Sequence, residues 1–435
     1  MRFSRWPFRR LGFWLTLTGL LAACVWPSTP PWLAPTTAAT AAPTAPPTPT
    51  PTPTPTPAPP TTLRVWLPET VRADVAPQAY DLLLQRLQAF ATAHDLRLEV
   101  RVKPLQGPSS ILATLQAARE VAPQLVPDVV LLPHGQLAAA AQQALIFPLP
   151  EDAFTTPLSD PDWYPYAQHL AMVQRVVYGV PFGADALGLV YHPQTVPTPP
   201  TTWKDWLQQP LPWLLPLGDP NGAVLLALYR TAGGHWADEN GRPLLEEAPL
   251  QQVLTFLQQA QQKERFDDTV LALTSDHMLW ARYPAETQAF LLTRFAHLLP
   301  GPDPRRIAAL PAPTGGQPVA LAYGLLWALA TPNARRQPLA VALLADLSDA
   351  AFVAQWTEAM GYLPPRQGVL DAWQQPKHRD LAKPLLPALQ GAPPDEIVEK
   401  VGPVLQQAAA QVLKGAQSPG AAAHEAAAAF PTAQP

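Results

Sequence analysis

The spacing of apolar residues predicts alternating strands and helices after residue 62. Apolar and polar residues alternate over 63–67 and 97–103, as in strands with one face in the core. Apolar residues then recur every three to four positions, which predicts helices near 80–91 and 111–118. Residues 128–132 form a buried strand. This strand–helix order is typical of a doubly wound parallel sheet, in which ligands bind at the carboxyl ends of the strands.

The rest of the chain continues to mix both kinds of element. Apolar runs predict strands at 186–191 and 319–330. Helical spacing predicts helices at 202–206, 250–257, 339–347, 352–360 and 397–413. The Ala-rich residues 416–435 are expected to form a loose tail. No repeat of 20–50 residues is visible, which argues against a solenoid.

The N-terminus has the pattern of an export signal. Four arginines lie within residues 1–10, and an apolar run over 11–21 is too short for a permanent membrane span. The run ends in Leu-Ala-Ala-Cys24, which resembles the lipobox of bacterial lipoproteins. We therefore expect residues 1–24 to be a signal peptide for general secretion rather than twin-arginine export, with a lipid on Cys24. The alternative is a plain signal peptide whose cleavage site happens to include a cysteine.

Residues 25–62 are rich in Pro, Thr and Ala, and Thr and Pro alternate strictly over 48–57. Proline fixes its own φ angle and lacks a backbone donor, so such a segment favours polyproline II and forms no core. We expect a stiff tether that holds a folded domain away from its anchor.

Composition narrows the class of protein. A chain of 435 residues with 48% hydrophobic residues and 14 Trp can fill two lobes. The charged fraction of 14% is low against roughly 25% in average proteins, and the net charge is −4. That sign argues against nucleic-acid binding. A single cysteine excludes an internal disulfide and a CxxC metal site.

Enzyme motifs are missing from the sequence. It contains no GxSxG, HExxH, P-loop or GxGxxG pattern, and its nine histidines are scattered singly. The close acid pairs, at 160/162, 246/247 and 267/268, lie in stretches expected to be loops. We therefore predict a protein that is not an enzyme, with no cofactor and no metal site.

Several separated segments together resemble the extracellular solute-binding proteins of bacterial ABC importers, in the maltose-binding-protein-like group. The resemblance extends from about residue 63 to 413. The segments that carry it are 127–136, 145–149, 177–191, 199–206, 232–234, 315–327 and 361–366.

This resemblance implies a two-lobed α/β fold of the type II periplasmic-binding class, whose lobes close on a solute by hinge motion. The solute-binding domain would span 63–415. Lobe 1 would comprise about 63–183 and 325–365, and lobe 2 about 190–315 and 366–415. Strands at 184–191 and 319–327 would cross between the lobes.

The resemblance also implies ligand positions in the cleft. These are Trp66, Glu69, His134, Gln136, Asp185, Asn221, Phe295, Tyr323, Trp327 and Arg366.

Each of these positions also has a purely structural reading. Asp185 binds solute or caps the hinge, and Trp66 stacks on a sugar ring or belongs to the core. His134 and Gln136 bond hydroxyl groups or lie in a surface loop. We expect the side chains of Tyr323 and Trp327 to face in different directions from their strand, so that only one of them reaches the cleft. Arg366 contacts the ligand or makes an ion pair.

Two departures from the family pattern argue against maltose itself. Residues 286–295 replace a strand of Gly and small residues that the family usually has before an aromatic residue. Leu132 and Gly135 stand where maltodextrin binders carry an aromatic residue and an acid. A carbohydrate solute is still favoured, since sugar sites combine aromatic platforms with hydroxyl-bonding groups.

The resulting hypothesis is a monomeric, lipid-anchored, extracytoplasmic protein that delivers a sugar to ABC permease subunits. One alternative is the same architecture with another solute, such as a polyamine or ferric ion, although the chain lacks the Tyr-Tyr pair of familiar ferric sites. A second is a degenerate lipoprotein that binds a partner protein or sensor. A secreted hydrolase is the least favoured.

Overall fold

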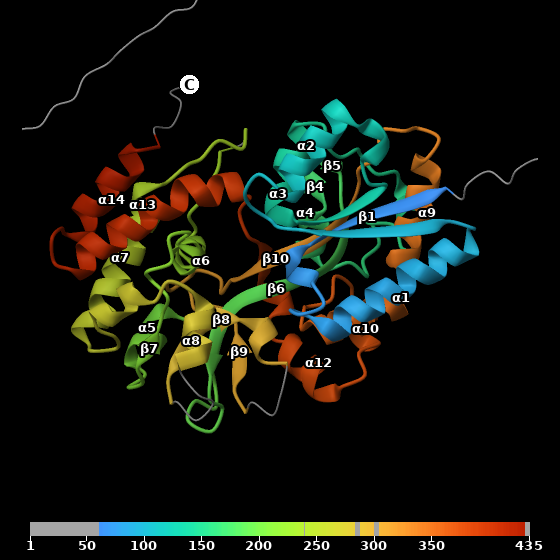
Figure 1. Ribbon diagram of the computed structural model, residues 1–435. Coiled ribbons are helices and arrows are strands. Elements are labelled where there is room, and N and C mark those ends of the chain that lie inside the picture. The colour runs from blue at the N-terminus through green and yellow to red at the C-terminus, as the bar shows by residue number, and fades with distance from the viewer. Residues whose placement is uncertain (1–60, 239, 283–287, 300–303, 431–435) are drawn as a thin grey trace, which may run out of the picture. The chain divides into compact units, whose positions relative to one another are not determined.

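The computed structural model describes residues 61–430, except 239, 283–287 and 300–303. The predicted signal peptide, Cys24 and nearly all of the predicted tether lie outside the described residues, as does Glu286. The expected two-lobed α/β architecture is confirmed, with two hydrophobic cores that share one sheet (Figure 1).

The first strands and helices form as the apolar spacing predicts. Strands β1 (Thr62–Pro68), β2 (Arg97–Lys103) and β3 (Val129–Pro133) are parallel, with Leu63 beside Leu98 and Val65 beside Val129. Helices α1 (Pro77–Ala93) and α2 (Ile111–Val121) connect them. The Ser110 side chain caps α2 by accepting a hydrogen bond from Ala113 N.

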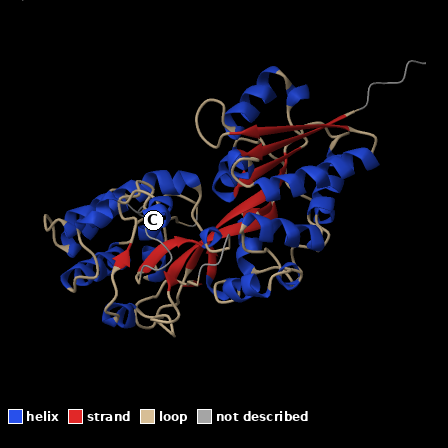
Figure 2. Ribbon diagram, turned by 60° about the horizontal axis from the view of Figure 1, so that its bottom comes forward, coloured by secondary structure: helices blue, strands red, loops and turns tan. Residues whose placement is uncertain are grey.

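One nine-stranded sheet joins the two cores, in the order β2-β1-β3-β10-β6-β8-β7. Figure 2 shows these strands running between the two groups of helices. The central strands β6 (Val180–Tyr191) and β10 (Ala320–Leu329) pair antiparallel, and both contribute residues to both cores. They correspond to the two predicted crossing strands.

The remaining strands lie mainly beside these two. They are β4 (Met172–Val173), β5 (Val176–Val177), β7 (Trp213–Leu214), β8 (Phe290–Arg294), β9 (Arg306–Ala308) and β11 (Leu389–Gly391). Strand β9 pairs with β6 and β11 with β10, whereas β4 and β5 form a separate two-stranded sheet.

Helices cover both cores. Those with residues in the first core are α1, α2, α3 (His134–Gln142), α4 (Pro165–Leu170), α9 (Gln337–Leu347), α10 (Ala350–Met360), α11 (Gln367–Asp371) and α12 (Pro376–Ala382). Those of the second core are α5 (Trp203–Gln208), α6 (Ala223–Thr231), α7 (Glu247–Gln262), α13 (Asp395–Leu413) and α14 (Pro419–Ala428). Helix α8 (Asp276–Arg282) packs on β8.

Short 3₁₀ turns complete the structure. They span Glu69–Val71, Pro123–Leu125, Glu151–Ala153, Asp268–Ala272, Phe295–His297 and Leu386–Ala388.

Within the described part of the chain, no single helix has the length and apolarity of a membrane span. Helices α9 and α10 reach that threshold only as a pair bent by 67°. Their large apolar residues, such as Leu343 and Trp356, are buried in the first core.

Two predicted boundaries need correction. Residues 366–389 were expected in lobe 2, but Leu370, Trp373 and Leu385 are buried in the first core, because α11 and α12 follow α10 back onto it. Residues 416–435 were expected to be loose, but α14 packs against α7 and α13. Its alanines Ala422, Ala423 and Ala426 are buried in the second core, where small side chains permit close approach.

The two cores also touch away from the crossing strands, where α3 meets the N-terminal end of α13. His134 Nε2 lies 2.6 Å from Ala392 O, a contact in which the imidazole N–H donates. A Cβ atom on Gly135 would collide with the Asp395 carboxylate, so a larger residue here would displace that side chain.

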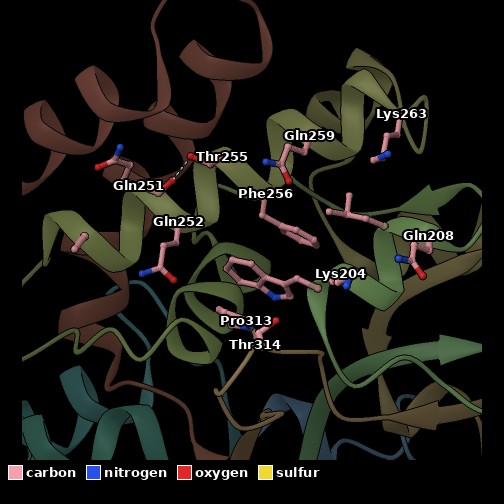
Figure 3. A pocket seen from close by; sticks show the side chains of 13 residues that line it. Lys204, Gln208, Gln251, Gln252, Thr255, Phe256, Gln259, Lys263, Pro313 and Thr314 are labelled. Atoms are coloured by element: carbon pink, nitrogen blue, oxygen red, sulfur yellow. Dashed lines mark hydrogen bonds between the residues drawn. The ribbon is translucent and has the colours of Figure 1, made fainter.

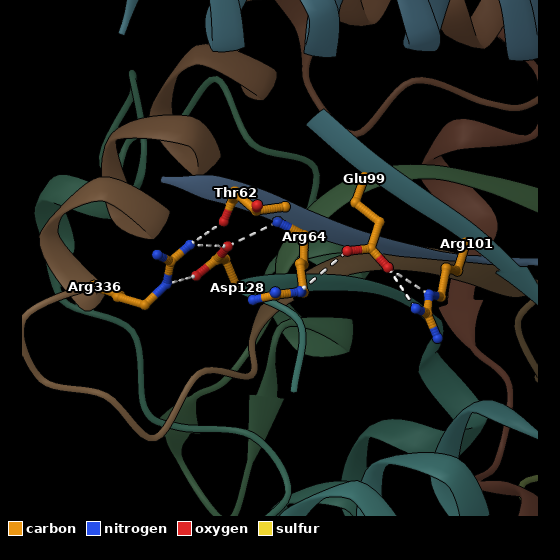
Figure 4. Close-up of polar contacts among 6 residues, drawn as sticks. All are labelled: Thr62, Arg64, Glu99, Arg101, Asp128 and Arg336. Carbon is orange, nitrogen blue, oxygen red and sulfur yellow. Dashed lines mark hydrogen bonds and ion pairs between the residues drawn. The ribbon is translucent and has the colours of Figure 1, made fainter. Parts of the chain in front are cut away.

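A buried ion pair fixes the start of the sheet. Asp128 is 1% exposed, and its carboxylate accepts two hydrogen bonds of 2.7 Å from Arg336 and one of 2.8 Å from Arg64 N (Figure 4). Arg336 also donates to Thr62 O. This group therefore ties β1 and β3 to the loop between β10 and α9.

We predict that Arg336→Met lowers the free energy of unfolding by about 3 kcal/mol, because it leaves a buried carboxylate without its cation. Urea unfolding measures this change. Glu99→Gln is the matched control, since Glu99 pairs with Arg64 and Arg101 at the surface and should contribute less than about 1 kcal/mol. Equal losses in both variants would contradict the structural role given to Asp128 and Arg336.

The His134 ring at the contact between the cores makes the free energy of unfolding depend on pH. Burial lowers the pKa of His134 to about 4, and the bond to Ala392 O offsets only part of that effect. A histidine in the unfolded chain takes up a proton near pH 6.5. The contribution of the neutral, buried His134 ring to the free energy of unfolding is therefore complete above pH 6.5 and is lost as the pH falls toward 4. When the pH is lowered from 7 to 4.5, we predict that the free energy of unfolding of His134→Asn decreases by about 2 kcal/mol less than that of the wild type.

Urea unfolding at the two pH values measures this difference. His424→Asn, at an exposed histidine on α14, should behave as the wild type. A wild-type pH response in His134→Asn would show that His134 does not resist protonation in the folded protein.

Candidate functional site

A polar cluster lies where the crossing strands β6 and β10 pair. Asp185 of β6 stands opposite Tyr323 of β10 in the antiparallel register. Every residue of β6 is buried, and Tyr323 is the one residue of β10 that is only partly buried. Asp185 Oδ1 accepts hydrogen bonds from Ala186 N at 2.8 Å and Ala296 N at 3.0 Å. The hinge strands therefore hold a carboxylate and a phenol side by side.

Arg294, at the end of β8, completes the cluster. Its guanidinium carbon lies 3.7 Å from the centre of the Tyr323 ring. Its nearest carboxylate atoms are Asp185 Oδ2 at 3.9 Å and Asp276 Oδ2 at 3.8 Å, both beyond hydrogen-bonding distance. Arg294 makes no hydrogen bond with any residue that the structure describes, although its side chain is only 27% exposed.

Asp276 carries an unused hydrogen-bond acceptor close to the Arg294 guanidinium. It is the first residue of α8, and its Oδ2 atom is buried but accepts no hydrogen bond within the described part of the chain. His297 Nε2 lies 3.4 Å from that atom. The His297 ring stacks on Trp280 at 5.2 Å between centroids, and Arg305 covers Trp280 at 4.2 Å. Asp276 Oδ2 and the Arg294 guanidinium therefore lie close together as an acceptor and donors that make no hydrogen bond with the described residues.

Charge in the cluster is fixed by its surroundings. Burial raises the pKa of Asp185, and Arg294 and the two backbone donors offset only part of that effect. Burial also acts on Asp276, but His297 and Arg294 outweigh it and lower the pKa of that carboxyl. Burial raises the pKa of the Tyr323 phenol. Asp276 is therefore an anion near neutral pH, beside a neutral phenol.

Such an arrangement suits a ligand that both donates and accepts hydrogen bonds. A hydroxyl group between Asp276 and Arg294 would donate to the carboxylate and accept from the guanidinium. Buried polar atoms are nearly always hydrogen-bonded, so the buried Asp276 Oδ2 atom, which lacks a hydrogen bond within the described part of the chain, indicates a bound water or ligand beside it. Tyr362 adds a second half-buried aromatic side chain near Asp185.

Three predicted ligand residues lie in the first core instead of the cleft. Trp66 is 2% exposed, and Phe295 and Trp327 are fully buried. Trp327 packs edge-on against Phe182 at 5.6 Å, and Lys103 lies over the Trp66 ring. In this conformation these rings offer no surface to a solute, and we do not retain them in the site.

Arg366 has a structural role in the described fold. It is 2% exposed, donates to Ser348 O at 2.6 Å and lies 5.0 Å over the Trp163 ring. These contacts tie the segment before α11 to the first core. They are hydrogen bonds and a cation–π contact, whereas the expected structural role was an ion pair, and Arg366 makes none with a described residue. Asn221 is exposed, in the turn before α6.

Glu69, His134 and Gln136 are occupied by contacts within the chain. Leu105 N donates to Glu69 Oε1 at 3.1 Å, and Gln136 Nε2 donates to Leu105 O at 3.0 Å. The His134 ring faces Ala392 O. The structure thus gathers Glu69 and Gln136 around one loop residue and places Asp185 with Tyr323, but it does not bring all the predicted positions together.

Asp276, Arg294, His297 and Tyr362 were not among the predicted site residues. The sequence carried one usable signal, since the charged Arg294 follows Thr293 directly after an apolar run over 289–292. Arg294 lies in the polar cluster at the end of β8, whereas Phe295, the next residue, begins a 3₁₀ turn and is buried in the first core. The helix that supplies Asp276 joins the site only through tertiary packing.

Among the described residues, no group of three His, Cys, Asp or Glu side chains has the arrangement of a metal site.

Comparison with protein families shows what the chain is similar to. The model of the family described as bacterial extracellular solute-binding protein matches residues 85–383, more than half of the chain. A comparison with curated proteins finds no match.

Solved structures share the fold at low sequence identity. The sugar-binding protein MalE of Xanthomonas citri has a TM-score of 0.67 at 19% identity, covering 85% of this chain and 96% of its own. MalE of Listeria monocytogenes, in complex with maltose, has a TM-score of 0.65 at 14% identity and covers 85% and 97%. A solute-binding protein of Thermotoga lettingae with bound α-D-tagatose has a TM-score of 0.60 at 16% identity and covers 85% and 98%. Together with the family match and the crossing strands between two cores, this shared fold leads to one conclusion: the chain belongs to the bacterial extracellular solute-binding proteins.

Proposed function

We propose that this protein captures a carbohydrate between its two lobes and delivers it to an ABC permease. The observation that carries the proposal is the unfilled pair of Asp276 Oδ2 and the Arg294 guanidinium, 3.8 Å apart at the crossing strands. A sugar hydroxyl is both donor and acceptor, so one such group satisfies both sides of the pair.

The charge balance of the cluster favours an uncharged solute over an acidic one. Asp185 and Asp276 lie beside Arg294, and the charge of Asp219 also acts on the Tyr323 phenol. These three carboxylates act on the Arg294–Tyr323 pair and repel an anion, whereas hydroxyl groups bond to either kind of side chain. The aromatic side chains Tyr323 and Tyr362 supply apolar surface beside these polar groups.

The similar structures support the same class of solute. The Listeria protein is described in complex with maltose and the Thermotoga protein with α-D-tagatose. The segments that depart from maltodextrin binders still argue against maltose for this chain.

Hinge motion about β6 and β10 would open and close the cleft. Because Tyr323 packs on the second core and Tyr362 on the first, a solute that contacts both rings would touch both lobes. Closure would remove the solute from water and strengthen each polar contact.

We further propose that a lipid on Cys24 anchors the monomeric protein at the outer side of the cell membrane. The support is the lipobox-like sequence ending in the only cysteine of the chain, followed by the Pro/Thr-rich tether. Cys24→Ser should move the protein from the membrane fraction to the soluble fraction of cells. Unchanged membrane association in that variant would exclude the lipid anchor.

A thermal-shift screen of the full chain against mono- and oligosaccharides tests the carbohydrate proposal. A sugar at 100 times its Kd should stabilise the fold by about 2.7 kcal/mol. We predict that Asp276→Ala and Arg294→Met each weaken binding of that sugar about 10- to 100-fold by isothermal titration calorimetry, since each loses charge-assisted hydrogen bonds.

Asp81→Asn, at an exposed carboxylate on α1, is the control and should bind as the wild type. Polyamines, amino acids and ferric citrate belong in the same screen. A response to one of these and to no sugar would change the solute class, and silence from folded protein would favour the partner-binding lipoprotein.

A further inference from the structure

A groove of about 690 Å³ lies between α5 and α7, on the second core. Its lining comes from these two helices and the loop at Pro313 and Thr314, and includes no residue of β6, β8 or β10. The groove is therefore separate from the polar cluster at the crossing strands. Its volume falls within the roughly 300–1,000 Å³ that ligand pockets occupy.

The floor of the groove is aromatic. The Trp203 and Phe256 rings stack with centroids 4.4 Å apart and planes 19° apart. The indole N–H of Trp203 donates to Pro311 O at 2.8 Å, so its polar atom is already satisfied. Trp203 is 7% exposed and Phe256 is 3% exposed, so the two rings close the floor of the groove and leave its polar contacts to the side chains around them.

Carboxamides line the walls above this floor. Gln251, Gln252 and Gln259 come from α7, and Gln208 comes from the end of α5 (Figure 3). None of these four side chains makes a hydrogen bond with a residue that the structure describes. Each amide has donors and an acceptor, and four of them unengaged in one groove suit a ligand rich in hydroxyl groups.

The charge of the groove is positive. Lys204 and Lys263 are exposed lining residues, and the lining contains no carboxylate. Neither lysine has an ion-pair partner among the described residues. Figure 3 shows Lys204, Lys263 and Gln208 toward one end of the groove and Gln251 and Gln252 toward the other. This charge complements an acidic group at one end of a ligand.

We propose that this groove is a second binding site, which takes an acidic oligosaccharide. The carboxylate or phosphate of the ligand lies at the lysines, and its hydroxyl groups bond to the carboxamides. This site goes beyond the solute capture proposed for the cleft, where three carboxylates disfavour such a ligand.

Isothermal titration of the full chain with trigalacturonate, maltotriose 6-phosphate and maltotriose tests the proposal. We expect the two acidic probes to bind more tightly than maltotriose at the groove, with an affinity that falls as salt is added. Lys204→Gln with Lys263→Gln should weaken acidic-probe binding by about tenfold for each lysine. The tighter acidic probe identifies carboxylate or phosphate as the favoured oxyanion.

Two controls separate this site from the rest of the surface. Lys414→Gln removes an exposed lysine just after α13 and should leave binding unchanged. Arg294→Met removes the guanidinium that an acidic probe would bind at the crossing strands and should leave acidic-probe binding unchanged, whereas loss of binding in this variant would place the probe there and not in the groove. The proposal is overturned if neither acidic probe binds, if maltotriose binds the groove equally well, or if the lysine variants bind as the wild type.

Discussion

The antiparallel pairing of β6 with β10 is the constraint on which the rest of the structure depends. Both strands run through both hydrophobic cores, and their side chains are buried along almost their whole length. The register shifts between Leu325 and Leu326, where Phe182 of β6 has no partner on β10. This irregularity lies within the first core, and bulges of this kind bend paired strands. The same pairing sets Asp185 opposite Tyr323, so the hinge and the candidate site are one feature.

Much of the fold could be predicted from the sequence, because hydrophobic period reports which face of an element is buried. The parallel start of the sheet, the two crossing strands and the helices over 337–360 formed as expected. The pattern could not assign the segment carrying Leu370 and Trp373 to the first core, since an apolar helix face does not specify its partner. It also failed at α14, where alanine is compatible with either a loose tail or close helix packing.

The candidate site was harder to predict, for a related reason. The family resemblance identified Asp185 and Tyr323 but predicted Phe295 instead of its neighbour Arg294. Phe295 is buried in the first core, whereas Arg294 joins the polar cluster. Asp276 belongs to a separate helix whose position depends on packing against β8. What marks these two residues is their unsatisfied hydrogen-bonding capacity in a nearly buried place. That property emerges only when the chain is folded.

The most direct test of this account is a crystal structure with the tightest-binding sugar found by the screen. The account predicts a ligand between the lobes at β6 and β10, with a hydroxyl group within hydrogen-bonding distance of both Asp276 Oδ2 and the Arg294 guanidinium. A sugar bound elsewhere, or one in the cleft that contacts neither side chain, would contradict it.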